Sequence, residues 1–176
     1  WVIEGATVVD GTGAAPFTAD VGVVDGHIAE VGRVSSAARE RMSGHGAWLT
    51  PGFVDIHTHY DGQATWDETF SPSIQHGVTT VMMGNCGVGF APHVTGRKAE
   101  LIALMEGVED IPGAALAEGV KFNWQSFGDY LDVLDAMPHS LDFLALVPHD
   151  PLRMAVMGDR ALAQQAATPA DINAMQ

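Results

Sequence analysis

One short segment constrains this chain more than any other: an apolar strand that ends in two histidines. Residues 51–59 read Pro-Gly-Phe-Val-Asp-Ile-His-Thr-His, so His57 and His59 follow the apolar run with a single threonine between them. A run rich in Val, Ile and Phe is typical of a strand buried on both faces of a parallel sheet. Two imidazoles belong at the end of such a strand only when something binds them. The segment therefore predicts a parallel sheet with a binding site at its edge.

The pattern of the following residues supports an α/β fold. Residues 78–83 and 141–147 read as two more buried strands, and apolar residues keep helical spacing over 101–108 and 127–134. A short helix is expected over 71–76, ended by Gly77, and Ser126 with Asp129 is expected to cap a later helix. Repeated strand–helix units are typical of an α/β fold with a parallel sheet. A complete eight-stranded α/β barrel takes about 250 residues, so residues 51–176 are expected to hold about its first three strands.

Residues 1–50 read as β structure of a different kind. Short β-prone runs flank Asp25-Gly26, a dipeptide typical of a hairpin turn in which both central residues have positive φ. Strands this short do not form a stable sandwich alone, so the segment is expected to need partners from elsewhere. The chain begins at Trp1 inside a strand pattern and ends soon after a capping box, Thr168 to Asp171. We therefore expect a fragment of a longer protein, inactive and poorly folded by itself.

Charge and cysteine content narrow the expected partners and compartment. The 176 residues include 22 Asp and Glu against 8 Lys and Arg, which gives a net charge of −14. This balance argues against nucleic acid and membrane as partners, because anionic partners require basic surface. Cys86 is the single cysteine, so no disulfide framework is expected and a reducing, cytoplasmic location fits. No apolar stretch predicts a membrane span.

The histidine pair and the cysteine are the candidate metal ligands. His57 and His59 lie two residues apart on a strand end, so their side chains point to the same side, and imidazole is the commonest metal ligand. Cys86 lies in Gly-Asn-Cys-Gly after the second predicted strand, so it opens on the same edge. A thiolate is a strong zinc ligand. Two other interpretations of Cys86 stay open: a packed apolar side chain, or a lone nucleophile.

Four further residues are candidates for lining a substrate pocket at this edge. Tyr60 and Asp61 directly follow the histidine pair, and His149 follows the third predicted strand. A structural hydrogen-bonding role is equally open for His149. Arg153, just beyond, is expected to hold either an anion or a loop. The remaining histidines are expected to be solvated: His27, His45, His76, His93 and His139.

Several motifs resemble those of a known family. The segment 51–59 resembles the signature of the amidohydrolase superfamily, and a β segment before it is typical of that superfamily. Narrower motifs at 84–87, 105–113 and 124–127 together resemble the N-acyl-D-amino-acid deacylases, or D-aminoacylases. The resemblance implies a TIM-like (β/α)8 metal-dependent hydrolase barrel preceded by part of a small β-sandwich domain. Residues 1–50 then form the N-terminal part of the small β domain, and residues 51–176 form the first βα units of a truncated barrel.

The resemblance also implies a chemistry. Members of this family use zinc to hydrolyse the linear amide of an N-acyl-D-amino acid, which gives a carboxylate and a free D-amino acid. Cys86 matches the ligand of the tight zinc site, and His57 with His59 matches the pair of a second, weaker site. The general base, an Asp, is expected beyond Gln176, so no catalytic residue is assigned within the chain. The partner is a small-molecule substrate, and the oligomeric state stays open.

Two alternatives remain. A cyclic-amide hydrolase of the dihydroorotase or hydantoinase type shares the histidine pair but typically bridges two metals with a modified lysine on a later strand. Cys86 at the second strand argues against it. The other alternative is a non-catalytic amidohydrolase-like scaffold. A scaffold does not need metal ligands, so the presence of His57, His59 and Cys86 argues against that interpretation.

Overall fold

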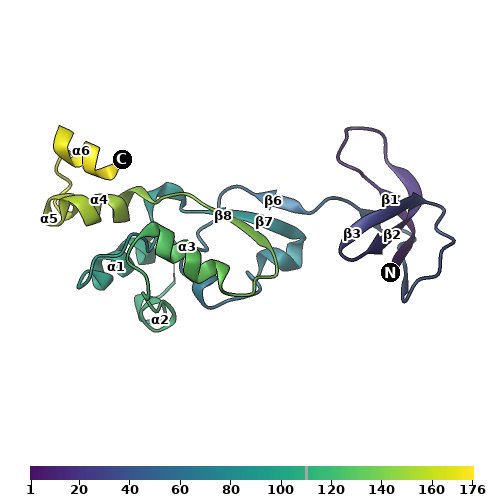
Figure 1. The fold of residues 1–176 in the computed structure, drawn as a ribbon, viewed down its shortest axis with the longest axis horizontal. Helices are drawn as coiled ribbons and strands as arrows, with labels where there is room; N and C mark the ends of the chain where they lie inside the picture. The colour runs from purple at the N-terminus through teal and green to yellow at the C-terminus, as the bar shows by residue number, and fades with distance from the viewer. Residues whose placement is uncertain (110) are drawn as a thin grey trace. The chain divides into compact units, whose positions relative to one another are not determined.

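The chain forms two compact units, Trp1–Gly52 and Phe53–Gln176 (Figure 1). The structure is a computed structural model that describes residues 1–109 and 111–176. Each unit has its own sheet and its own apolar core. Asp110, which belongs to the 105–113 motif, lies outside the described residues. Within the described ranges, no helix combines the length and apolar character needed to cross a membrane.

The first unit is built on a five-stranded sheet. Its strands are β1 (Val2–Val8), β2 (Phe17–Val24), β3 (His27–Gly32), β4 (Arg41–Ser43) and β5 (Trp48–Leu49). The order is β3-β2-β1-β4, and β5 also pairs with β1. β2 runs antiparallel to both β1 and β3, whereas β4 and β5 run parallel to β1. Its apolar core consists of Val8, Ala19, Val21 and Val23.

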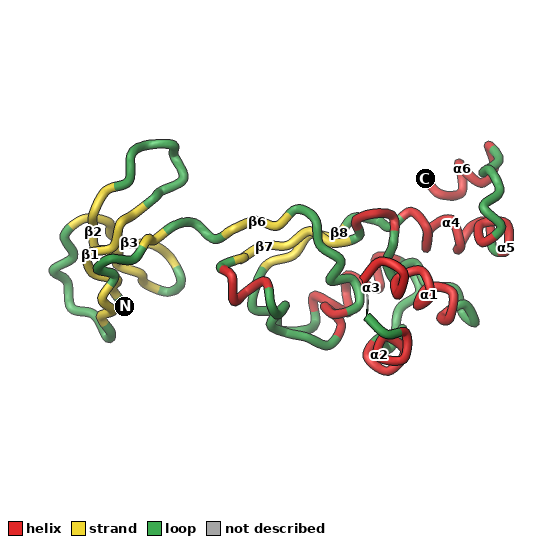
Figure 2. Tube along the Cα trace, turned by 180° about the vertical axis from the view of Figure 1, so that it is seen from behind, coloured by secondary structure: helices red, strands yellow, loops and turns green. Residues whose placement is uncertain are grey.

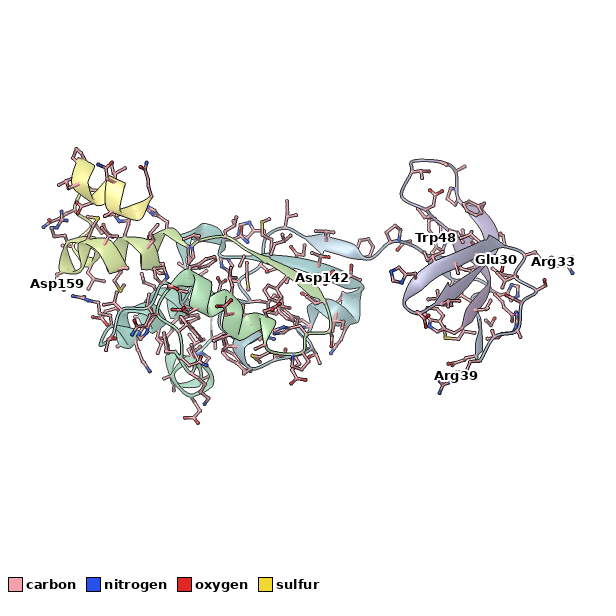
Figure 3. The ribbon with its side chains drawn as sticks, in the orientation of Figure 1. Glu30, Arg33, Arg39, Trp48, Asp142 and Asp159 are labelled. Carbon is pink, nitrogen blue, oxygen red and sulfur yellow. The ribbon has the colours of Figure 1, made fainter. Side chains whose placement is uncertain are left out.

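The predicted hairpin at Asp25-Gly26 is confirmed. Both residues have positive φ, 48° and 78°, and the turn joins β2 to β3. β3 is the outer strand of the sheet, and every residue in it before Gly32 is exposed. Arg33 and Arg39, which follow it, point outward from this unit (Figure 3). The exposed side chains of β3 do not set its register against β2. The geometry of the hairpin turn sets that register instead.

The second unit contains a three-stranded parallel sheet. Its strands are β6 (Phe53–Asp55), β7 (Val78–Met83) and β8 (Asp142–Ala145), in the order β6-β7-β8. β7 has the bounds expected from the sequence, while β6 and β8 are shorter than the predicted 52–57 and 141–147. The three strands lie side by side in the view of Figure 2. The predicted α/β fold with a parallel sheet is therefore confirmed.

Helices and 3-10 turns connect and follow these strands. The helices are α1 (Lys98–Glu109), α2 (Gly113–Gly119), α3 (Phe127–Asp135), α4 (His149–Met157), α5 (Asp159–Leu162) and α6 (Pro169–Met175). The 3-10 turns lie at Gln63–Thr65, Ser73–His76 and Asn85–Gly87. Both predicted capping boxes are confirmed, since Ser126 with Asp129 begins α3 and Thr168 with Asp171 begins α6. Gly77, with a φ of 81°, ends the turn before β7 as expected.

Contact between the helices and the sheet forms the core of the second unit. α1, α2 and α3 gather on one side of the three strands in both views (Figures 1 and 2). The buried side chains that meet there include Leu101 and Met105 of α1, Tyr130 and Leu134 of α3, and Val81 and Met83 of β7. Burying a large apolar side chain contributes about 1.5–3 kcal/mol, so this cluster anchors β7 at the centre of the unit.

The expectation of buried strands is wrong at both edges of the sheet. The apolar segment 52–57 is predicted to be buried on both faces, yet Phe53, Val54 and Ile56 are 60%, 58% and 70% exposed. The reason is position, because β6 lies at the edge of the sheet and, in the part of the chain that the structure describes, pairs with β7 alone. Its apolar side chains lie outside the core cluster to which α1 and α3 contribute. In the predicted third strand, Leu144, Leu146 and Val147 are 52%, 45% and 52% exposed, because β8 lies at the other edge.

The expectation of solvated histidines is wrong for two of the five and holds for the others: His27, His45 and His76. His93 is 9% exposed, its ring lies 5.0 Å from the Phe122 ring, and its Nδ1 lies 3.3 Å from the Trp124 carbonyl oxygen. His139 is half-buried, and its Nε2 lies 3.1 Å from the Ala64 carbonyl oxygen. Both rings occupy sites made by residues distant in sequence, which local pattern does not reveal.

The end of β7 depends on a glycine, which gives a test of the fold. Gly84 has a φ of 80°, and a Cβ there would lie 2.1 Å from the carbonyl oxygen of Leu146. Gly84→Ala is therefore expected to push apart the segments that follow β7 and β8. We expect the free energy of unfolding of the whole protein, measured by denaturant titration, to fall by more than about 2 kcal/mol.

Gly96→Ala is the matched control. Gly96 has a φ of 88°, but nothing lies within 4 Å of an added Cβ. Only the backbone strain applies there, which costs about 1–2 kcal/mol. Equal losses in the two variants would show that the contact with Leu146 does not hold the strand ends together.

Candidate metal centre

The carboxyl ends of β6 and β7 bring two segments to one edge of the sheet. The strands are parallel, with Asp55 opposite Val81, so both chains leave the sheet in the same direction. Thr58 extends the pairing beyond β6, since its backbone N–H donates to the Met82 carbonyl oxygen at 2.9 Å. The residues that follow each strand therefore face one another across a short gap.

His57, His59 and Cys86 meet at this edge. The Nε2 atom of His57 lies 3.3 Å from Sγ of Cys86, and the ring centroids of the two histidines are 5.5 Å apart. One ligand atom from each of the three residues lies within 4.8 Å of the others. No other group of three or more His, Cys, Asp or Glu residues in the described ranges has this geometry. Two nitrogens and one sulfur are a donor set that zinc accepts, so these residues fit a zinc ion.

The backbone of Cys86 directs its thiol toward the histidines. Cys86 has a φ of 55° and a ψ of 9°, a left-handed conformation that is uncommon for any residue except glycine. Gly84 and Gly87 have φ of 80° and 79°, so three of the four residues 84–87 have positive φ. Holding a non-glycine residue in this region costs of the order of 1–3 kcal/mol. The side chain is exposed, so the structure does not show Cys86 as a packed apolar residue.

Two residues that the sequence interpretation did not single out link the ligand-bearing segments. Nδ2 of Asn85 donates to the carbonyl oxygens of Thr58, at 3.1 Å, and Met82, at 2.9 Å. Oγ1 of Thr58 donates to the same Met82 oxygen at 2.7 Å. The signal for both residues in the sequence is position alone, since Thr58 separates the histidines and Asn85 precedes Cys86.

Burial and the neighbouring His57 ring favour the neutral form of His59, and Asp55 orients the backbone of His57. Burial lowers the pKa of His59, and the neighbouring His57 lowers that pKa further. A lowered pKa favours the neutral imidazole, which is the form that binds a metal ion. Oδ1 of Asp55 accepts a hydrogen bond from the backbone N–H of His57 at 3.1 Å, which orients the chain as it leaves β6.

Tyr60 and Asp61, two of the predicted pocket residues, are buried. Tyr60 is 9% exposed, and its hydroxyl lies 2.7 Å from Oγ of Ser73 and donates to the Phe70 carbonyl oxygen at 3.3 Å. Asp61 is 3% exposed, and its carbonyl oxygen accepts a hydrogen bond from the Tyr130 hydroxyl at 2.8 Å. Burial raises the pKa of Tyr130 well above its usual value, and Asp61 raises it further. The structure thus places both residues against the core.

His149 and Arg153 both lie on α4 but make different contacts. His149 is exposed at the start of α4, and a Cβ added to Gly87 would lie 3.5 Å from the His149 Cβ. His149 therefore adjoins the turn that carries Cys86. Nη2 of Arg153 donates to the carbonyl oxygen of Gln165 at 2.7 Å, so Arg153 holds a loop. The two residues share a pocket of about 390 Å³ with Leu104, Asp150, Met154, Ala161, Leu162 and Gln164.

Comparison with known proteins gives relatives of this chain along its whole length. The D-aminoacylase of Alcaligenes xylosoxydans xylosoxydans is 37% identical over 176 residues, which cover 99% of this chain and 34% of the relative. A solved D-aminoacylase structure, described by its binuclear metal centre, superposes with a TM-score of 0.79 at 38% identity over 98% of this chain and 34% of that one.

A second solved structure is an N-acyl-D-glutamate deacylase from Bordetella bronchiseptica, complexed with zinc and a phosphonate that mimics the tetrahedral intermediate. It superposes with a TM-score of 0.72 at 34% identity, over 99% of this chain and 34% of that one. The chain thus spans about a third of the length of the relatives it matches. A family model described as "Amidohydrolase family" matches residues 44–176. The chain, with its α/β fold and its His-His-Cys cluster at a strand edge, belongs to the amidohydrolase family.

Proposed function

We propose that the protein hydrolyses the amide bond of N-acyl-D-amino acids, giving a carboxylate and a free D-amino acid. The observation that carries this proposal is the cysteine thiol 3.3 Å from a histidine nitrogen at the carboxyl edge of a parallel sheet. The similarity to a D-aminoacylase and to an N-acyl-D-glutamate deacylase supports the substrate class. The thiol at the second strand also favours linear amides over the cyclic amides of the alternative interpretation.

We propose zinc as the resident metal. Because Sγ of Cys86 lies 3.3 Å from Nε2 of His57, we propose that Cys86 serves the site of the histidine pair as well as the tight site that the resemblance implies. The donor set supports zinc, as does the zinc-bound deacylase to which this chain is similar. When bound, zinc supplies Lewis acidity that polarises an amide carbonyl and makes water more acidic. The protein orients the metal ligands. The left-handed conformation of Cys86 directs its thiol toward the histidines, and the hydrogen bond to Asp55 holds the backbone of His57. We propose that the general base, an Asp, lies outside residues 1–176.

The rest of the proposal concerns the whole molecule. Residues 51–176 are proposed to be the first βα units of a TIM-like barrel, and residues 1–50 to be part of a small β domain. The exposed apolar side chains of β6 support this, because a strand at such an edge gains burial when further strands and helices cover it. We also propose that the enzyme is cytoplasmic and acts on a small-molecule substrate. We propose neither a nucleic-acid nor a membrane partner.

Enantiomer preference tests the proposed reaction. The whole protein is expected to release methionine from N-acetyl-D-methionine and to leave N-acetyl-L-methionine largely untouched, because the related deacylases are named for D-amino-acid substrates. The measurement is kcat/KM for each enantiomer, with a cyclic amide such as a hydantoin as a third substrate. Preference for the L form, or turnover of the cyclic amide alone, would overturn the proposed substrate class.

Removal of the thiol tests the metal. Cys86→Ala in the whole protein is expected to lower zinc affinity by more than about 100-fold and to abolish turnover, because a thiolate ligand is lost. Zinc content after dialysis is measured by atomic absorption. His76→Ala is the control, since His76 is exposed and precedes β7, at the opposite end of that strand from Cys86. One retained equivalent of zinc with normal turnover in Cys86→Ala would make Cys86 a structural residue only.

A further inference from the structure

One side-chain amide links the two segments that carry the proposed metal ligands. Nδ2 of Asn85 donates to the carbonyl oxygen of Thr58 at 3.1 Å, and so reaches the residue between the two histidines. It also donates to the Met82 carbonyl oxygen at 2.9 Å, at the end of β7. Asn85 itself is the residue before Cys86, so its side chain spans the gap that a metal ion would bridge.

The Met82 carbonyl oxygen is the point where this network converges. It accepts hydrogen bonds from the backbone N–H of Thr58 at 2.9 Å, from Oγ1 of Thr58 at 2.7 Å and from Nδ2 of Asn85. Three donors on one oxygen fix the end of β6, the end of β7 and the turn that follows in a single arrangement. Because these donors share one acceptor, they form a single network that links the two ligand-bearing segments.

We propose that Asn85 is the positioning residue of the metal centre: its amide holds the His57–Thr58–His59 segment and Cys86 at the separation that lets one ion contact thiol and imidazole. The backbone strain at Cys86 makes such a clamp necessary, since a left-handed cysteine persists only where its surroundings hold it there. Asn85 contributes donors to two carbonyl groups, so it acts through the backbone of the ligand segments. This inference rests on the proposed function only in taking the cluster as a metal site.

Two substitutions separate positioning from charge. Asn85→Ala removes the amide, and Asn85→Asp keeps its size but replaces both donors with oxygen that faces two carbonyl oxygens. If Asn85 acted only by its polarity near a cation, the added negative charge of Asp would tighten metal binding. If it acts as a clamp, both variants weaken binding, by about 10- to 100-fold as is usual when a partner that orients a metal ligand is lost.

The readouts are independent of activity. Zinc affinity of the whole protein is measured by competition with a chromophoric chelator. The near-ultraviolet thiolate-to-cobalt charge-transfer band of the Co²⁺-loaded protein reports whether Cys86 still contacts the metal, and we expect it to be lost or weakened in both variants. Asn123→Ala is the matched control, since Asn123 is exposed and lies far along the chain from the cluster; it should leave both readouts unchanged.

The melting temperature of each metal-free variant separates metal positioning from folding. If Asn85→Ala does not fold, the same assay on Asn85→Asp and on Thr58→Val, which removes one donor to Met82, carries the test. Unchanged zinc affinity and an unchanged cobalt band in the folded variants would overturn the proposal. If Cys86→Ala also kept its zinc, the metal site itself would be wrong; if Cys86→Ala lost zinc while the Asn85 variants kept it, only the positioning role would fail.

Discussion

The parallel pairing of β6 with β7 is the constraint on which the metal centre depends. Asp55 lies opposite Val81, and the Thr58–Met82 hydrogen bond continues this alignment past the end of β6. Parallel strands end at the same edge, so this register brings the histidine segment beside the turn that carries the cysteine. A slip of one residue would turn each side chain of β6 to the other face and separate the imidazoles from the thiol. The core cluster holds β7 in place through Val81 and Met83. β7 in turn positions the turn that follows it and carries Cys86.

The backbone of the turn that carries Cys86 has an unusual conformation, and this favours a metal ion at this edge of the sheet. A left-handed cysteine is costly for folding alone. A metal ion that bridges thiol and imidazole would offset that cost, because binding to the folded form stabilises it. The same turn brings Gly87 against His149, so α4 adjoins the centre from the neighbouring strand. Segments that follow three strands, β6, β7 and β8, thus lie at one edge of the sheet.

Local signals in the sequence were sufficient for much of the fold. The bounds of β7, the Asp25-Gly26 turn and both capping boxes follow from residue type within a few positions, and the structure confirms them. The meeting of the histidine pair with Cys86 was also predictable, because the ends of parallel strands share an edge. What depends on distant residues was not predictable: the exposure of β6 at a sheet edge, the hydroxyl of Tyr60 turned to Ser73, and the donors that Asn85 extends across the gap. Each of these depends on which segments pack together, which no local pattern contains.

X-ray absorption spectroscopy at the zinc edge of the zinc-loaded whole protein tests the central claim most directly, because it reports the atoms that surround the metal. The account predicts one sulfur neighbour at about 2.3 Å together with imidazole nitrogens at about 2.0–2.1 Å, and loss of the sulfur contribution in Cys86→Ala. A metal shell of nitrogen and oxygen atoms alone in the unmodified protein would contradict the account. Cys86 would then lie next to the histidines without binding the metal ion.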